Sequence, residues 1–338
     1  MTAPRTRPPG MNDVARVAGV SHQTVSRVLN DHPNVRAETR DRVLEAIAAL
    51  GYRRNSAARA LVTRRSGTLG IVTTDSFQFG PSRTLIAIEE AAREAGYHVS
   101  VATLRTVDTS SMNDALEHLM DQAVEGIVVI APHAEVVDAV RAFHDRLPIV
   151  VVAAIPDPPE SVTTVSVDQG LGARLVVRHL ADLGHHEVVH LAGPHGWLDA
   201  DARASAWADE CELLGLPASE PIKGDWSAGR GYEVGRELAR SGPPTAVFAA
   251  NDQLALGLLR AFNEAGLRIP EDVSVAGFDD FTGADNFIPP LTTVRPGFEA
   301  LGTRIIQALL GVLDGRPIGP AVLDPQLVIR ESTGAPRS

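Results

Sequence analysis

The sequence has a single cysteine and no long apolar run. With Cys211 alone in 338 residues, a disulfide framework and a thiolate metal cluster are excluded within one chain. No stretch approaches the ~18 to 20 apolar residues that span a bilayer, and the Pro- and Arg-rich residues 1–10 lack the apolar region of an export signal. We therefore expect a soluble cytoplasmic protein with a disordered tail at 1–10 and with Cys211 buried in a helix.

Charge is distributed unevenly along the chain. Residues 1–66 hold twelve Arg against five Asp and Glu, a balance of +7, whereas the whole chain sums to −11, so the remainder carries −18. A basic first part on an acidic body is typical of a protein whose first part binds phosphates. The length leaves room for two or three domains, and the 44% apolar content is ample for a sizeable core.

Residues 14–30, VARVAGVSHQTVSRVLN, predict two short helices joined by a tight turn. Apolar residues recur at helical spacing in both halves, as Val14, Val17 and Ala18 and then as Val25, Val28 and Leu29. Gly19 tolerates positive φ and ends the first helix, and Ser21 is a suitable N-cap for the second. Such a helix-turn-helix reads the major groove of DNA. The alternative, a helical hairpin with a solvated polar face, is disfavoured by the basic charge.

The pattern continues with a third helix and then changes. Residues 37–50 repeat apolar residues at helical spacing up to Gly51. Asn55 is a possible N-cap for a further segment up to residue 63, which is too short to be a stable isolated helix. Residues 64–67 read as a linker.

From residue 68 apolar strands alternate with helices, which predicts parallel sheets covered by helices. The strands expected are 68–74, 99–104, 126–130 and 149–154 in a first unit, and 188–193, 246–250 and 273–278 in a second. The helices expected are 82–95, 112–122, 135–146, 200–214, 228–240 and 252–265. We interpret 162–184 as the crossing between units, 291–295 as a return strand, 298–313 as a helix of the first unit and 326–329 as a closing strand. Two such lobes form a cleft at the carboxyl ends of their strands, where ligands bind.

Seven motifs in order over residues 11–333 resemble the LacI/GalR family of transcriptional repressors. They are DVARVAGVSHQTVSRVLN, ALGYRRNSAARAL, LAGP, GDWSA, ANDQLALG, VAGFDD and IPPLTTV, and three of them are most similar to lactose-responsive members. The resemblance implies a homodimer with a small all-α helix-turn-helix headpiece and an α/β core of two doubly wound parallel-sheet lobes, like a periplasmic binding protein. It divides the chain into a headpiece at 11–54, a hinge helix and linker at 55–66 and a core at 67–333. The first lobe would be about 67–166 and 296–325, and the second about 167–290 and 326–333.

The resemblance also implies residues that bind operator DNA. In the recognition helix and at its ends they are Ser21, His22, Gln23, Thr24, Ser26, Arg27 and Asn30, and in the hinge they are Asn55, Ala58 and Leu61. Gln23 can pair with adenine and Arg27 with guanine, whereas Thr24 can equally be a packing residue. The resemblance places Leu61 in the minor groove, and the alternative is that it packs against its own lobe. His22 replaces a Tyr of lactose-responsive members, and Arg54 replaces a common Pro.

For the effector, the resemblance implies residues around the cleft, namely Phe79, Asp199, Arg203, Trp226, Asn251, Asp279 and Phe298. Charged and amide groups bind vicinal hydroxyls and an aromatic ring covers the apolar face of a sugar, so a saccharide is expected, with galactosides as candidates. Trp226 could instead be lobe core and Asp279 a loop cap. Three departures from lactose-responsive members leave the sugar open: Ala153 and Ala154 in place of a strand-end Asp, Pro296 in place of Gln, and Asp199 in place of a small hydroxyl residue.

The chain end and the sign of control give two further expectations. The sequence ends in STGAPRS without heptads, so we expect a dimer and no tetramer. Whether the effector is an inducer or a co-repressor stays open.

Three further motifs in the sequence lack the structural setting that their usual chemistry requires. Residues 186–190 spell HExxH, but zinc chemistry needs a helix and this stretch reads as the start of a strand. The adjacent Asp279 and Asp280 diverge, unlike a glycosidase pair, and GRGYEVG at 229–235 opens a helix instead of following a strand. An exported sugar receptor would carry a signal and no headpiece. We therefore expect no catalytic residues, no metal and no cofactor.

Overall fold

The computed structural model describes residues 9–30, 32–52, 65–74, 78–130, 133, 139–141, 143, 146–155, 162–316 and 319–337. The chain forms two compact units, Met1–Ser66 and Gly67–Ser338. Most of the predicted tail, the hinge helix, Arg54 and most of the helix predicted at 135–146 lie outside the described residues. Within the described residues, every helix is too short or too polar to span a membrane.

The headpiece consists of three helices around a small apolar core. They are α1 (Met11–Ala18), α2 (His22–Leu29) and α3 (Ala37–Leu50). Gly19 and Gly51 end α1 and α3 with φ of 64° and 59°, as predicted for a left-handed C-cap. The core comprises Val14, Ala15, Ala18, Val25, Val28, Val43, Ala46 and Tyr52. The placement of Val17 on the buried face was wrong, because Val14, Ala15 and Ala18 fill that face and leave Val17 55% exposed.

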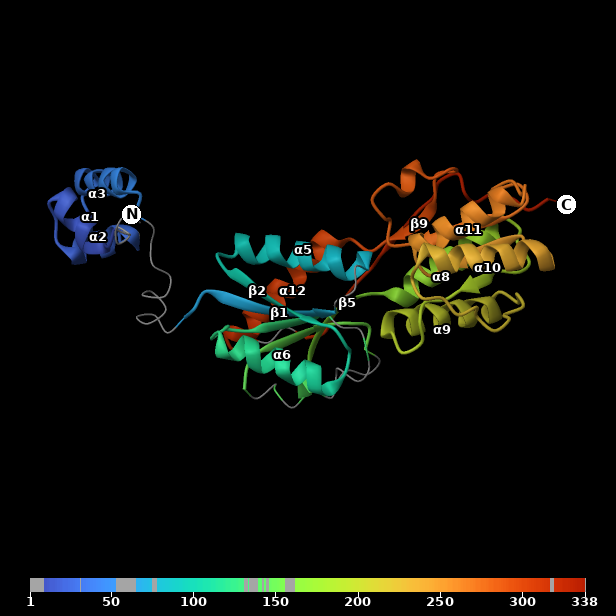
Figure 1. Ribbon diagram of the computed structural model, residues 1–338, viewed down its shortest axis with the longest axis horizontal. Coiled ribbons are helices and arrows are strands. Elements are labelled where there is room, and N and C mark those ends of the chain that lie inside the picture. The colour runs from blue at the N-terminus through green and yellow to red at the C-terminus, as the bar shows by residue number, and fades with distance from the viewer. Residues whose placement is uncertain are drawn as a thin grey trace, which may run out of the picture. The chain divides into compact units, whose positions relative to one another are not determined.

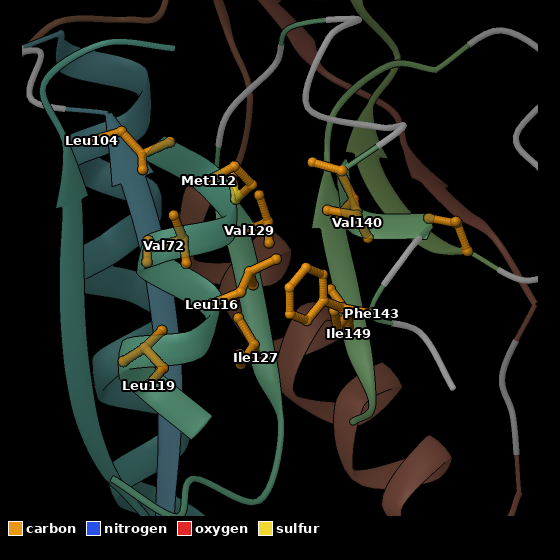
Figure 2. Packing of buried hydrophobic residues seen from close by; sticks show 14 of the residues in the cluster. Val72, Leu104, Met112, Leu116, Leu119, Ile127, Val129, Val140, Phe143 and Ile149 are labelled. Atoms are coloured by element: carbon orange, nitrogen blue, oxygen red, sulfur yellow. The ribbon is translucent and has the colours of Figure 1, made fainter. Parts of the chain in front are cut away.

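The first lobe is a parallel sheet between two layers of helices. Its strand order is β10-β5-β4-β3-β1-β2. The strands are β1 (Thr68–Thr74), β2 (His98–Leu104), β3 (Ile127–Ile130), β4 (Ile149–Val152), β5 (Thr163–Val167) and β10 (Ala321–Leu323). Helices α5 (Phe79–Glu94) and α12 (Phe298–Leu313) cover one face, and α6 (Thr109–Asp121) covers the other (Figure 1). Figure 2 shows Met112, Leu116 and Leu119 of α6 packed toward Val72, Ile127 and Val129 of the sheet.

The second lobe is a mixed sheet in the order β11-β9-β8-β7-β6. The strands are β6 (Val189–Leu191), β7 (Ala246–Ala249), β8 (Ser274–Phe278), β9 (Thr292–Arg295) and β11 (Gln326–Val328). The helices are α8 (Gln169–Asp182), α9 (Leu198–Leu213), α10 (Ala228–Ser241), α11 (Asp252–Glu264) and the 3₁₀ turn η1 (Ala284–Asn286). Strand β11, the predicted closing strand, is antiparallel to β9, so this sheet is parallel except at that edge. Cys211 is fully buried in α9, as predicted.

The segment 162–184 is the main difference from the sequence-based interpretation. It is not only a crossing, because it contains strand β5 and helix α8, and the short strand β10 was also missed. The chain passes between lobes at three places: at Asp168 after β5, at Pro296 and Gly297 before α12, and at Asp324 and Pro325 between β10 and β11. Three neighbouring crossings connect the lobes along one side of the cleft.

Candidate functional sites

Helix α2 presents a polar face away from the headpiece core. His22, Gln23 and Arg27 are exposed, and within the described residues their side chains make no hydrogen bond or ion pair. Since the helix is held by the buried Val25 and Val28, these three side chains are positioned by a fixed element and remain available to a partner. This is the arrangement by which a recognition helix reaches base edges.

The other predicted residues of the headpiece have local contacts. Ser21 Oγ accepts the N–H of Thr24 at 3.1 Å and shares a hydrogen bond with its hydroxyl at 2.9 Å. Ser21 is therefore the N-cap that the sequence predicted. Asn30 Nδ2 donates to Ser26 Oγ at 3.5 Å. The predicted hinge residues Asn55, Ala58 and Leu61 lie outside the described residues.

In the core, one pocket opens between the carboxyl ends of the two sheets. The space within it is about 720 Å³, counting space open to solvent. All seven residues predicted to surround the cleft line this pocket, namely Phe79, Asp199, Arg203, Trp226, Asn251, Asp279 and Phe298. They come from the segments that follow strands or precede helices and from the first two turns of helices in both lobes, where such folds bind ligands.

Arg203 lies at the centre of the second-lobe wall. Its Nε donates to Gln169 Oε1 at 2.9 Å, Nη1 donates to the carbonyl of Ala250, and Nη2 lies 3.6 Å from Asp279 Oδ1. Its guanidinium carbon is 3.6 Å from the centroid of the Phe278 ring. Arg203 is only 6% exposed. The guanidinium plane is therefore fixed by stacking and by hydrogen bonds, which orients the remaining N–H groups.

Two neighbouring carboxyl groups have raised pKa values. Burial raises the pKa of Asp279 to about 6, Arg203 opposes this rise and Asp199 adds to it. Asp252, next to the pocket, has a pKa well above its usual value, first because of burial and then because of Asp279. Its oxygens accept the Thr293 hydroxyl at 2.5 Å and the Phe281 N–H at 2.6 Å. Asp252 thus supports the loop after β8 that carries Asp279.

Aromatic rings form the remaining walls. Trp226 packs over Gly193, where an added Cβ would lie 2.3 Å from the indole ring. Trp197 meets Trp226 edge to face, with ring centroids 5.7 Å apart. Phe79 of the first lobe contacts Phe298 at 5.9 Å and Phe281 of the second lobe at 4.9 Å. Trp226 is 6% exposed and also lines the pocket. It is therefore both a core residue of the second lobe and a wall of the pocket.

Asn251 and Asp199 are each held by a backbone group. Asn251 caps α11 by accepting the Leu254 N–H at 2.8 Å, and its amide donates to the Trp226 carbonyl at 3.1 Å. Asp199, in the first turn of α9, accepts the Ala154 N–H at 3.3 Å from the other lobe. Burial raises the pKa of Asp199, and Arg203 opposes the rise.

Sequence reasoning missed several pocket residues and set one motif aside correctly. Gln78, Ser166, Gln169 and Trp197 also line the pocket. Gln169 lies within the segment 162–184 that was interpreted as a crossing, and Trp197 lies just before the predicted helix 200–214. A more precise prediction of where α8 and α9 begin could have found both. In the HExxH stretch, His190 lies in β6 and hydrogen-bonds the Phe248 carbonyl at 3.0 Å, while His186 is exposed before the strand. The helix that this metal motif requires is therefore not formed there.

Known protein families match both units of the chain, the headpiece and the core. Residues 10–55 match the family of bacterial regulatory proteins described as lacI family, and residues 177–333 match a periplasmic binding protein-like domain. The chain is 34% identical to the lactose operon repressor of Escherichia coli (strain K12) over 335 residues, which covers 98% of this chain and 92% of that one. It is 32% identical to the HTH-type transcriptional regulator CelR of Thermobifida fusca, over 97% of this chain and 99% of that one.

Solved structures show the same similarity. A lac repressor dimer bound to operator and the anti-inducer ONPF has a TM-score of 0.88 and 34% identity, covering 97% of this chain and 100% of that chain. The complex of CelR with cellobiose has a TM-score of 0.72 and 29% identity, covering 96% and 99%. The relatives named here are transcriptional regulators, and a transport receptor is not favoured. The chain belongs to the LacI family of bacterial regulatory proteins and is a DNA-binding transcriptional regulator.

Proposed function

We propose that the protein is a repressor whose operator affinity is lowered when a saccharide binds between the two lobes of the core. The observation that carries this proposal is the pocket at the carboxyl ends of both sheets, lined by charged, amide and aromatic side chains. The complex of the relative CelR with cellobiose supports a sugar as the ligand. A galactoside is one candidate, since the lac repressor is among the relatives.

Each side chain has a proposed role in binding the sugar. Arg203, Asn251 and Asp279 form hydrogen bonds to ring hydroxyls, because planar fixed groups suit vicinal donors and acceptors. Trp226 and Phe298 cover the apolar face of the ring, and Phe79 closes the pocket from the first lobe.

Two copies of the chain bind one operator together. The lac repressor binds its operator as a dimer, which supports a homodimer here as well. His22, Gln23 and Arg27 of each copy contact base edges of one half-site, and Ser21, Thr24, Ser26 and Asn30 support the helix or contact phosphates. A hinge at residues 55–66 carries Asn55, Ala58 and Leu61 to the centre of the operator.

The coupling between the sites follows from lobe movement. A ligand that contacts both lobes favours one arrangement of the three crossings, and this changes how the two first lobes of a dimer hold the hinges. The effect on operator affinity is limited by the difference in ligand affinity between the two arrangements. We further propose that the protein acts in the cytoplasm and catalyses no reaction, as expected of a regulator of this family.

A gel-shift titration tests the proposal. The probe is DNA upstream of the protein's own gene, incubated with the full chain and with a panel of galactosides, glucosides and other saccharides. We expect a specific shift that one class of sugar releases. A shift that no sugar changes would remove the saccharide from the proposal, and a sugar that strengthens the shift would reverse the sign of control.

A further inference from the structure

The charges that line the pocket are all on one lobe. Among the described residues, the charged side chains of the lining are Asp199, Arg203 and Asp279, and all three belong to the second lobe. The opposite wall is made of neutral groups such as Phe79, Ile130, Val152, Ala153, Phe298 and Leu301. Among the residues that the structure describes, a charged group on the ligand therefore finds its counter-charge on the second lobe.

Arg203, the one cation among the described residues of this lining, already has partners. Arg203 makes hydrogen bonds to Gln169 and to the Ala250 carbonyl and lies 3.6 Å from the Asp279 carboxylate. An anion that approached Arg203 would compete with Asp279 for the same guanidinium. Its binding would also leave Asp279 as a buried carboxyl without its cation, which is costly in an interior of low polarity.

Asp199 adds a second carboxyl to the lining, and it shares the positive charge of Arg203 with Asp279. Its side chain accepts the Ala154 N–H at 3.3 Å, and within the described residues it forms no salt bridge. When Arg203, Asp279 and Asp199 are all ionised, at a pH above the raised pKa values of the two carboxyl groups, the described part of the lining carries a net charge of −1. Such a wall attracts hydroxyl and ammonium donors, and it repels phosphate and carboxylate groups because apolar surroundings screen the repulsion weakly.

We propose that this pocket selects saccharides that carry no anionic group, and that Asp199 is the residue that imposes the selection. The proposal rests on the proposed function and narrows it to neutral and amino sugars, excluding sugar phosphates and sugar acids. Asp199 acts through its charge and its position at the junction of the lobes, where it meets the backbone of β4.

The test compares probes that differ in charge. Glucose, glucosamine, glucose 6-phosphate and inorganic phosphate are titrated calorimetrically into the full-length protein at about pH 8, which is above the pKa of about 6 of Asp279. The variants are Asp199→Asn and the control Asp201→Asn, which removes a carboxylate from the same turn of α9 but outside the pocket lining. Because the basic headpiece can also bind phosphate, two further variants identify binding in the pocket. They are the single variant Arg203→Met and the double variant Asp199→Asn with Arg203→Met.

We expect no saturable binding of the two phosphate probes to the wild-type pocket. Asp199→Asn should gain at least about tenfold in affinity for them by removing one charge repulsion, the double variant should lose this gain, and Asp201→Asn should match wild type. Wild-type binding of glucose 6-phosphate that Arg203→Met abolishes would overturn the proposal. So would equal behaviour of Asp199→Asn and Asp201→Asn. If the phosphate results hold but no saccharide of the wider panel releases the operator, the proposed function fails while the charge selection stands.

Discussion

The carboxylate of Asp199 accepts the backbone N–H of Ala154 at 3.3 Å, and this hydrogen bond joins helix α9 of the second lobe to the end of β4 in the first. The strand end itself offers only alanine side chains, Ala153 and Ala154, so its polar contact is supplied from across the cleft. A ligand that binds Asp199 therefore acts on a group that also links the lobes. The same residue therefore affects both which ligand binds and how the two lobes are arranged.

Replacement of Arg203 should separate effector response from DNA binding. Arg203→Met removes the guanidinium that is stacked on Phe278 and paired with Asp279, so the concentration of releasing sugar needed should rise by about 10- to 100-fold, the cost of a lost charged hydrogen bond. Operator affinity without sugar should stay within about twofold of wild type, because Arg203 lies in the pocket of the core and not in the headpiece. The control Arg260→Met removes an exposed guanidinium of α11. An unchanged sugar response in Arg203→Met would remove this residue from the site.

The pKa of Asp279 predicts a pH dependence of stability. Because burial raises this pKa to about 6, the folded state holds a proton that the unfolded state has released between pH 4 and 6. The contribution of Asp279 to the free energy of unfolding is therefore favourable at low pH and is lost as pH rises through 6. Asparagine cannot titrate and tolerates the φ of 103° at this position. Relative to Asp279→Asn, the wild type should lose about 1 to 3 kcal/mol between pH 4 and 7.

Urea unfolding of the two proteins at several pH values measures this difference. Comparing the two chains cancels the titration of groups that lie far from Asp279. Parallel stability curves for wild type and Asp279→Asn would show that Asp279 keeps an ordinary pKa.

Gly193 should be intolerant of any side chain. A Cβ there would lie 2.3 Å from the Trp226 ring, so Gly193→Ala must displace the indole from the pocket wall. We expect a loss of about 1 to 3 kcal/mol of stability from overpacking, together with weaker sugar binding. Gly229→Ala is the matched control, because its nearest neighbour would be 3.6 Å away, at Ser227 Oγ. Thermal unfolding and sugar titration of both variants decide the matter; equal effects would mean that Trp226 is not held by this contact.

The exposed face of α2 predicts which substitutions weaken binding to the operator without weakening binding to random DNA. Gln23→Ala and Arg27→Ala should each weaken operator binding by about 1 to 3 kcal/mol and leave binding to random DNA nearly unchanged, because contacts to base edges carry the specificity. Fluorescence anisotropy with operator and scrambled duplexes at the same salt concentration measures both affinities. Proportional losses on the two duplexes would assign these side chains to phosphates instead.

The sequence alone predicted the bounds of a helix or strand correctly where its apolar residues form one clear pattern. The predicted bounds of 68–74, 37–50 and 298–313 coincide with β1, α3 and α12. In these elements apolar residues recur with one period, and Gly51 marks the end of α3. The seven pocket residues came from the family resemblance and not from periodicity, since most of them lie at or just outside the end of a helix or strand, where periodic signals are weak.

Tertiary contacts explain what the sequence could not reveal. Helix α8 contains Gly170 and Gly172, which weaken a helical pattern. Gly172 is required because a Cβ there would lie 2.5 Å from the Phe278 ring, a contact between distant segments. Helix α5 begins at Phe79, three residues before its predicted start, because Gly80 and Pro81 fit in a first turn that needs no N–H donors. Trp197 joins the pocket only because α9 brings it against Trp226.

The central claim is that sugar binding in the cleft and operator binding by the headpiece are coupled. The most direct measurement is a pair of titrations on the full-length protein: operator affinity with and without saturating sugar, and sugar affinity with and without saturating operator. Coupling requires that the sugar weakens operator binding and that the operator weakens sugar binding by the same factor, typically about 5- to 150-fold. Sugar and operator that bind with unchanged affinities in each other's presence would contradict the account.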